Sequence, residues 1–393
     1  MLNAASRMLF VGSFPPRECG IATFTADVVD AYDARFGTRS HIVAIEEPGG
    51  EDRVYPSRVV ARLRQNDRQS YRDIAVLADA HFCDAVNIQH EYGLFGGEDG
   101  EWFLEFLSAV RKPTVVTLHT VLPNPSPNHR RVARLICDTA SAIVVLSETG
   151  RDILVARYGA DATKINVIHH GVPDVPFRET AIPKQSLGLD GRLVISTFGL
   201  INRGKGLEYA IDAMRTIAQR HPEALYLILG QTHPVIRRHE GESYRESLQA
   251  MVAEFGLENN VKLVGKYLAF DELVNYLAAT DVYLTPYLNP VQIVSGTLAY
   301  AVGCGKAVVS TPYLYAQELL AHGRGCLVEF RDAAGIGSTV CTLLDDPGLR
   351  ASIERRAYRF GRQMIWPNVA DALGQLFTRL TSDERREVIA LPA

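Results

Sequence analysis

Residues 291–311, VQIVSGTLAYAVGCGKAVVST, place a turn of small residues directly before a helical pattern and a short apolar strand. The turn is Ser295-Gly296-Thr297, and the strand covers residues 307–310. Backbone N–H groups at a helix start are free to bind an anion, and small side chains leave room for a phosphate. The turn follows the apolar strand 282–285, so we expect it at the carboxyl edge of a parallel sheet, where open α/β sheets bind ligands. The stretch therefore predicts phosphate chemistry.

The same alternation of apolar runs and amphipathic segments continues along the chain, and it is typical of parallel strands joined by crossover helices. In the first half the expected strands are 8–12, 41–45, 85–89, 114–118, 142–146 and 166–168. The helical patterns between them are 22–32, 71–80, 102–110 and 130–139. In the second half the expected strands are 193–198, 225–229, 261–263, 282–285, 307–310 and 325–329. The fold class is α/β, with two doubly wound, Rossmann-like domains facing each other across a cleft.

The chain of 393 residues is long for a single hydrophobic core, so two domains are expected. We place the first domain at 1–175, a proline-containing linker at 176–191 and the second domain at 192–365. The linker is the expected hinge for closure of the two domains. The remaining residues, 366–393, begin with an amphipathic helix. Whether this helix packs back on the first domain is left open.

Composition and charge exclude several classes of protein. The formal net charge of −4 gives no support to a nucleic acid as a partner, which would need a basic face. The six cysteines have neither the spacing of metal ligands nor the density of a secreted disulfide scaffold. No apolar run reaches about 18 residues, and the N-terminus shows no signal-peptide pattern. We expect a cytoplasmic protein with no metal and no cofactor.

Five segments occur in an order and at a spacing that resemble glycosyltransferase family 4. They are residues 15–24, 117–119, 167–174 (VIHHGVPD), 198–206 (FGLINRGKG) and 303–311. Members of this family have two facing Rossmann-like domains, the GT-B fold, in agreement with the pattern of strands. The resemblance implies that the second domain holds a nucleotide diphosphate sugar as donor. It also implies that the first domain holds the acceptor, and that the anomeric configuration is retained.

Four candidate site residues lie in the predicted first domain. Gly20 opens the first helix, and the family has a comparable glycine loop beside the donor diphosphate; an ordinary strand-to-helix turn is the alternative. His119 ends a strand at the position where the family has a histidine near the transferred sugar. A neutral imidazole there can hydrogen-bond sugar hydroxyls. His90 and Glu91 end another strand and are expected on the acceptor side.

Five further candidates lie in the predicted second domain. Arg203 and Lys205 follow the strand 193–198, where cations can neutralise a leaving diphosphate. Lys205 also matches the family's lysine before glycine. Ser295, Gly296 and Thr297 form the turn that is expected to bind phosphate. The alternative for the two cations is a solvated surface pair.

The chain departs from the family pattern at three positions. Gln292 and Tyr300 stand where the family has two glutamates that contact the donor sugar and the ribose. Gln292 can hydrogen-bond a sugar without a charge, and Tyr300 offers one hydroxyl in place of a carboxylate. Leu200 replaces an arginine, for which Arg203 is the expected substitute. The departures put the nucleotide, and the use of a nucleotide at all, in question.

Residues 57–72 have a basic character, because five arginines lie within them. One interpretation is contact with an anionic lipid surface or a phosphorylated acceptor, which would make the protein a peripheral membrane protein. The other interpretation is a solvated face of the domain.

Together these features predict a retaining glycosyltransferase that moves a hexose, with mannose and glucose as the first candidates, to a hydroxyl acceptor. The acceptor class is left open between a carbohydrate, a lipid and a small molecule. Two alternatives remain. A disaccharide phosphorylase would use phosphate or a sugar 1-phosphate, and a non-catalytic protein would only bind a sugar phosphate or a nucleotide.

Overall fold

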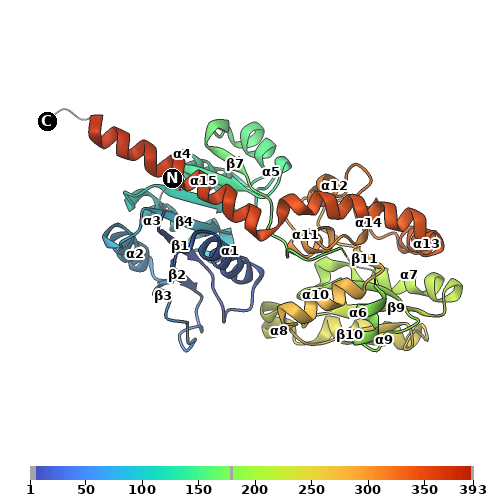
Figure 1. Ribbon diagram of the computed structural model, residues 1–393. Helices are drawn as coiled ribbons and strands as arrows, with labels where there is room; N and C mark the ends of the chain where they lie inside the picture. The colour runs from blue at the N-terminus through green and yellow to red at the C-terminus, as the bar shows by residue number, and fades with distance from the viewer. Residues whose placement is uncertain (1–5, 178–179, 391–393) are drawn as a thin grey trace. The chain divides into compact units, whose positions relative to one another are not determined.

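The computed structural model describes residues 6–177 and 180–390 and divides the chain into two compact units (Figure 1). Unit 1 comprises Met1–Gly171 and Trp366–Ala393, and unit 2 comprises Val172–Ile365. Each unit contains one parallel sheet with helices packed on it, so the predicted α/β class is confirmed. Residues 178–179 of the predicted linker, residues 391–393 of the tail and residues 1–5 of the first domain lie outside the described residues.

Unit 1 contains a seven-stranded parallel sheet in the order β3-β2-β1-β4-β5-β6-β7. Its strands are β1 (Met8–Gly12), β2 (His41–Glu46), β3 (Val59–Arg64), β4 (Ala85–His90), β5 (Thr114–Leu118), β6 (Ala142–Val145) and β7 (Ile165–Val167). Every residue of β1, β4, β5 and β6 is buried, as expected for strands covered on both faces. The strand order reverses between β1 and β4, so a crevice is expected beyond their carboxyl ends.

The helices of unit 1 cover the sheet in two groups. The helices are α1 (Gly20–Phe36), α2 (Arg68–Ala80), α3 (Phe103–Ala109), α4 (Pro127–Thr139), α5 (Glu148–Ile153) and α15 (Trp366–Ala390). The last of these, α15, packs along α1, whereas α2, α3 and α4 pack against one another in succession (Figure 1). Phe377 of α15 is completely buried, and its ring lies 5.5 Å from that of Tyr32. Helix α15 therefore contributes Phe377 to the core of unit 1.

Unit 2 contains a six-stranded parallel sheet in the order β10-β9-β8-β11-β12-β13, and the order reverses between β8 and β11. Its strands are β8 (Leu193–Phe198), β9 (Ala224–Leu229), β10 (Val261–Val264), β11 (Val282–Thr285), β12 (Ala307–Ser310) and β13 (Cys326–Leu327). Its helices are α6 (Ala181–Ser186), α7 (Leu207–Arg220), α8 (Pro234–Glu240), α9 (Ser243–Glu254), α10 (Phe270–Ala279), α11 (Gly296–Gly303), α12 (Leu314–Leu319), α13 (Ala333–Asp345) and α14 (Pro347–Gly361).

Strand β3 and helix α6 are among the elements that were not expected from the sequence. Strand β3 forms inside the basic segment 57–72, with Leu63 buried and its arginines exposed or partly exposed. An edge strand is covered on fewer sides than a central one, so its sequence is more polar than that of a buried strand. Helix α6 lies within the predicted linker and packs against α10 of unit 2.

The burial of Phe377 generates a prediction about stability. Phe377→Ala should lower the free energy of unfolding of unit 1 by about 3–5 kcal/mol, because a fully buried ring is replaced by a cavity. Urea denaturation measures this change. Asp371→Asn is the matched control on the same helix, because it removes only a partly exposed ion pair with Arg35 and should cost under about 1 kcal/mol. Equal losses in the two variants would contradict the packing of α15.

Candidate active site

Three segments of unit 2 meet beyond the carboxyl ends of β8 and β11. The turn Arg203–Lys205 follows β8, Tyr287 follows β11, and Ser295 caps the N-terminus of α11. Because β8 and β11 are the neighbouring strands at which the sheet reverses its order, this is the edge where a ligand site is expected. The structure thus brings Lys205 together with the predicted phosphate turn.

A chain of hydrogen bonds connects these segments. The Nζ of Lys205 donates to the Tyr287 hydroxyl over 2.7 Å, and that hydroxyl lies 2.7 Å from the hydroxyl of Thr297. The Thr297 hydroxyl lies 3.1 Å from that of Ser295, whose Oγ accepts from the N–H of Leu298. One ammonium and three hydroxyls therefore gather at the start of α11.

The backbone fixes the turn that carries Lys205. Gly206 has a φ of 58°, and a Cβ at this position would lie 2.2 Å from the carbonyl oxygen of Pro286. The N–H of Leu288 donates to the carbonyl of Gly204 over 2.9 Å. The lysine turn is thus held directly against the chain that leaves β11, and no residue with a side chain fits at Gly206 without strain.

The other candidates of unit 2 lie outside this hydrogen-bonded chain. Arg203 is exposed, and its side chain lies 3.5 Å from Glu240 and 5.1 Å from the ring of Tyr244. The amide of Gln292 donates to the carbonyl of Val294 over 2.9 Å. Tyr300 is 7% exposed, and its ring lies 6.2 Å from that of Phe198 in the core.

In unit 1, His119 lies at the carboxyl end of β5 with its ring held on two sides. Its Nε2 lies 2.9 Å from Oε1 of Gln89, and the edge of its ring meets Phe24 at 4.8 Å between centroids. Phe24 also contacts His170 at 5.0 Å. Burial, with smaller contributions from His170 and His90, lowers the pKa of His119 to about 3. The imidazole is therefore neutral at physiological pH.

Glu91 follows β4 as His119 follows β5, and these two strands are adjacent in the sheet. Its carboxylate accepts a 2.5 Å hydrogen bond from the Thr120 hydroxyl and another from the N–H of Tyr92. Burial raises the pKa of Glu91, because the charged form is poorly solvated. His90 points the other way: it is fully buried and its ring stacks on Phe95 at 5.2 Å. Of the two predicted acceptor-side residues, only Glu91 lies at the edge of the sheet with a polar partner.

Gly20 is the first residue of α1 and is exposed, with open space where a Cβ would lie. The cap of this helix is Cys19, whose Sγ accepts from the N–H of Ala22 over 3.4 Å. The space around Gly20 leaves the start of α1 accessible, as a ligand would require. Gly20 lies in unit 1, whereas the turn around Ser295 lies in unit 2.

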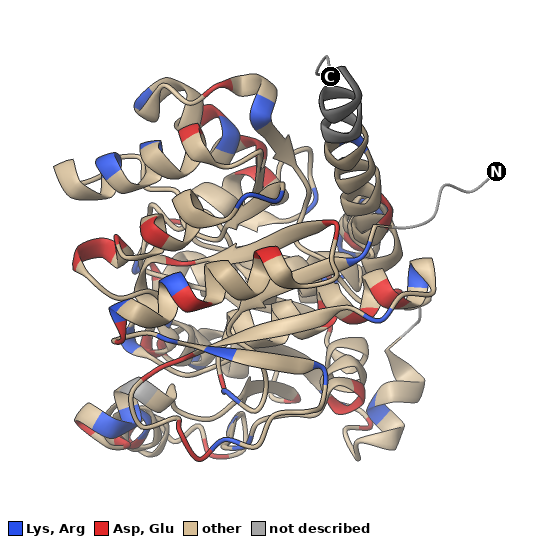
Figure 2. Ribbon diagram, turned by 90° about the vertical axis from the view of Figure 1, so that its left-hand side faces the viewer, with Lys and Arg blue, Asp and Glu red and all other residues tan. Residues whose placement is uncertain are grey.

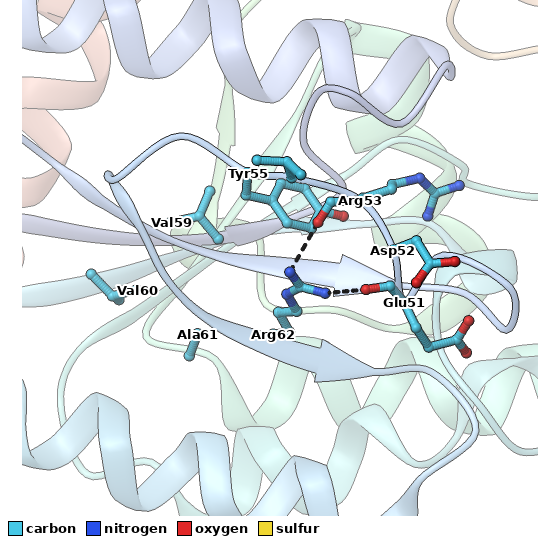
Figure 3. A pocket seen from close by; sticks show the side chains of 9 residues that line it. Glu51, Asp52, Arg53, Tyr55, Val59, Val60, Ala61 and Arg62 are labelled. Atoms are coloured by element: carbon cyan, nitrogen blue, oxygen red, sulfur yellow. Dashed lines mark hydrogen bonds between the residues drawn. The ribbon is translucent and has the colours of Figure 1, made fainter.

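The arginines of residues 57–72 face carboxylates. The pairs are Arg58 with Asp30 and Asp33, Arg62 with Glu46, Arg64 with Asp67, and Arg68 and Arg72 with Glu105. Arg62 also donates to the backbone oxygens of Glu51 and Arg53 beside a small surface pocket (Figure 3). Figure 2 shows basic and acidic residues interspersed along the described helices and loops. This pairing favours a solvated face over a surface that binds anionic lipid.

Two family models match the chain, one in each unit. The model described as "Glycosyltransferase Family 4" matches residues 19–174, and the model described as "Glycosyl transferases group 1" matches residues 192–346. This chain is a glycosyltransferase of the family 4 type. The two matches account for both of the doubly wound sheets.

Relatives with assigned names agree with this identification. The glycosyltransferase is 27% identical to the D-inositol 3-phosphate glycosyltransferase of Streptomyces avermitilis, over 67% of this chain and 57% of that protein. It is 28% identical to the 2-deoxystreptamine glucosyltransferase of Streptomyces kanamyceticus, over 58% of this chain and 59% of that protein. The chain thus spans less than two thirds of the length of these two relatives.

The fold of the glycosyltransferase is also found among solved structures. The crystal structure of Anabaena Alr3699/HepE in complex with UDP has a TM-score of 0.75 and 19% sequence identity, over 96% of this chain and 100% of that one. At this identity the likeness establishes the fold, which confirms the predicted GT-B class.

Tyr287, Gln89 and Thr120 are contacts of the candidate residues that the sequence did not identify. Each lies within two residues of the carboxyl end of a buried strand, which is the one signal that could have pointed to them.

Across the part of the glycosyltransferase that the structure describes, no helix has the length and apolarity needed to cross a bilayer. The same part contains no group of three or more His, Cys, Asp or Glu side chains arranged to hold a metal ion.

The buried histidines of the glycosyltransferase generate a prediction about pH. Burial lowers the folded pKa of His90 and His119 to about 3 and that of His170 to about 4, whereas an unfolded histidine titrates near 6.5. Below about pH 6.5 the unfolded chain therefore binds protons that the folded chain excludes. The free energy of unfolding should fall as the pH drops, by up to about 1.4 kcal/mol per pH unit for each histidine.

Urea unfolding between about pH 7 and about pH 5 measures this loss, in a range where most carboxylates stay ionised. His90→Leu removes one of the three groups, so its stability should fall less steeply with decreasing pH than that of the natural protein. The same slope in both proteins would show that His90 titrates normally in the folded chain.

Proposed function

We propose that this glycosyltransferase moves a hexose from a nucleotide diphosphate sugar to a hydroxyl acceptor with retention of the anomeric configuration. The observation that carries the proposal is the meeting of the Lys205 ammonium with the hydroxyls of Ser295 and Thr297 at the start of α11. Glucose and mannose are the first candidates for the transferred sugar. The diphosphate of the donor is assigned to unit 2.

The chemistry of a leaving diphosphate fits this part of unit 2. The first intrahelical hydrogen bond of α11 runs from the N–H of Ala299 to the carbonyl of Ser295. The N–H groups of Gly296 and Thr297 come before it, so they are placed to bind phosphate oxygens. Negative charge grows on the diphosphate as the bond to the sugar breaks, and Lys205 supplies a positive charge to stabilise it. The leaving phosphate would then accept the proton of the acceptor hydroxyl.

In unit 1 we assign His119 to the sugar and the pair Glu91–Thr120 to the acceptor. The imidazole of His119 is neutral, so it can hydrogen-bond a hydroxyl without adding positive charge near an oxocarbenium-like centre. Glu91 and Thr120 offer a carboxylate and a hydroxyl at the same edge of the sheet. This is the kind of group that recognises a polyhydroxylated acceptor.

The comparisons support the two substrate classes. A solved structure of Anabaena Alr3699/HepE contains UDP and glucose, which is consistent with a nucleotide sugar as donor. The names of the two relatives give D-inositol 3-phosphate and 2-deoxystreptamine as acceptors of those proteins. We therefore propose a small polar acceptor ahead of a lipid, and the pairing of the arginines of residues 57–72 adds no support for a membrane partner.

The test is release of the nucleotide from UDP-, GDP- and ADP-sugars in the presence of a panel of polyol and saccharide acceptors. Lys205→Ala should lower kcat with the preferred donor by about 100-fold, since it removes a charge that stabilises the leaving group. Its melting temperature should change little, because Lys205 is only partly buried. Lys262→Ala, at an exposed position of β10, is the matched control and should keep full activity.

Two results would overturn the proposal. One is product formation from a sugar 1-phosphate, or from phosphate and a disaccharide, without any nucleotide. The other is a Lys205→Ala variant that turns over the donor as fast as the Lys262→Ala variant does.

A further inference from the structure

The hydroxyl of Tyr287 connects the Lys205 ammonium to Thr297 at the start of α11. The position of Tyr287 is itself fixed in two ways. The ring is 4% exposed and stacks on Tyr313, with centroids 5.5 Å apart and planes at 15°. The backbone carbonyl of Tyr287 accepts a 2.5 Å hydrogen bond from the Thr311 hydroxyl. Because ring and backbone are both held, the phenol oxygen stays at one position beside Lys205.

The direction of the hydrogen bonds follows from the chemistry of the groups. An ammonium only donates, so Lys205 donates and the oxygen of Tyr287 accepts. The O–H of Tyr287 then needs an acceptor, and the Thr297 hydroxyl at 2.7 Å provides one. In turn, the hydroxyl of Thr297 can donate to Ser295 or to a ligand. In this series of hydrogen bonds the hydroxyl protons therefore point away from Lys205 and toward the N-terminus of α11. The N-terminus of a helix attracts anions.

The hydrogen bond to Tyr287 uses only one of the N–H donors of the Lys205 ammonium. An ammonium has three N–H donors, and within the described residues its hydrogen bond to a protein atom is the one to Tyr287. The remaining donors are free for the oxygens of a ligand. A lysine side chain has four rotatable bonds, so fixing its end before the donor binds removes an entropic cost from the reaction.

We propose that Tyr287 is a positioning residue for Lys205, which it holds in the place where the ammonium meets the leaving diphosphate. This inference rests on the proposed function, because the diphosphate is the assigned partner of Lys205. Tyr287 acts through its hydroxyl. The ring packs on Tyr313, and its centroid lies 4.4 Å from the Nζ of Lys205. A phenylalanine at this position would keep both ring contacts.

The experiment compares Tyr287→Phe with Tyr315→Phe. Both variants remove one phenol hydroxyl from a buried tyrosine of unit 2, but the hydroxyl of Tyr315 has no hydrogen-bond partner among the described residues. Tyr287→Phe should lower kcat about tenfold while the KM for the nucleotide sugar changes less than about threefold, since the lost hydrogen bond to a charged group acts mainly in the transition state. Tyr315→Phe should leave both constants near those of the natural protein.

A second measurement does not depend on turnover. Competitive acetylation with acetic anhydride, read by mass spectrometry, compares the labelling rate of Lys205 with that of the exposed Lys262. Lys205 should be labelled several-fold faster in Tyr287→Phe than in Tyr315→Phe, because its ammonium has lost the hydrogen bond to the Tyr287 hydroxyl. Equal labelling of Lys205 in the two variants, or equal kcat, would overturn the role of Tyr287. If the natural protein turns over no nucleotide sugar, the proposed function fails, and the labelling rates still decide whether Tyr287 holds Lys205.

Discussion

The close contact between Gly206 and the carbonyl of Pro286 is the constraint on which the candidate site of unit 2 depends. It presses the turn after β8 against the chain that leaves β11, two segments about eighty residues apart in sequence. The contact leaves no space for a side chain, and the left-handed backbone at this position favours glycine independently. Because the turn is fixed by backbone, Lys205 reaches the start of α11 without an ion pair to any carboxylate among the described residues. The positive charge of Lys205 therefore remains available to bind a ligand.

The candidate residues of unit 1 depend on burial more than on backbone contact. Burial, more than any charged neighbour, determines the protonation of its polar groups: it keeps His119 neutral and makes the carboxyl of Glu91 harder to ionise. The two groups lie at the ends of adjacent strands, so their positions are set by the sheet. Under the proposed function, unit 2 would supply a positive charge to the diphosphate, and unit 1 would offer a neutral imidazole and the carboxyl of Glu91 to hydroxyl groups.

Much of this arrangement could be predicted from the sequence, because buried parallel strands have an unmistakable apolar pattern. Strands β1, β5, β8, β11 and β12 begin and end where expected, and the turn at Ser295–Thr297 opens a helix, α11, as predicted. Strand β3 was missed because an edge strand with alternating arginines lacks that pattern. Tyr287 was missed for another reason. An aromatic residue after a buried strand is usually a core residue, and its contact with Lys205 arises only when two distant loops meet.

The return of α15 to unit 1 has a consequence for how the chain folds during synthesis. Unit 2 is an insertion within unit 1, since residues 172–365 are made before the helix that completes the first core. All the strands of unit 2 have left the ribosome before Phe377 can pack against Tyr32. Until then, the apolar side of α1 that α15 covers stays open to water. The unit that is translated first is therefore the last to be finished, and a nascent chain of this enzyme must keep that surface from aggregating in the meantime.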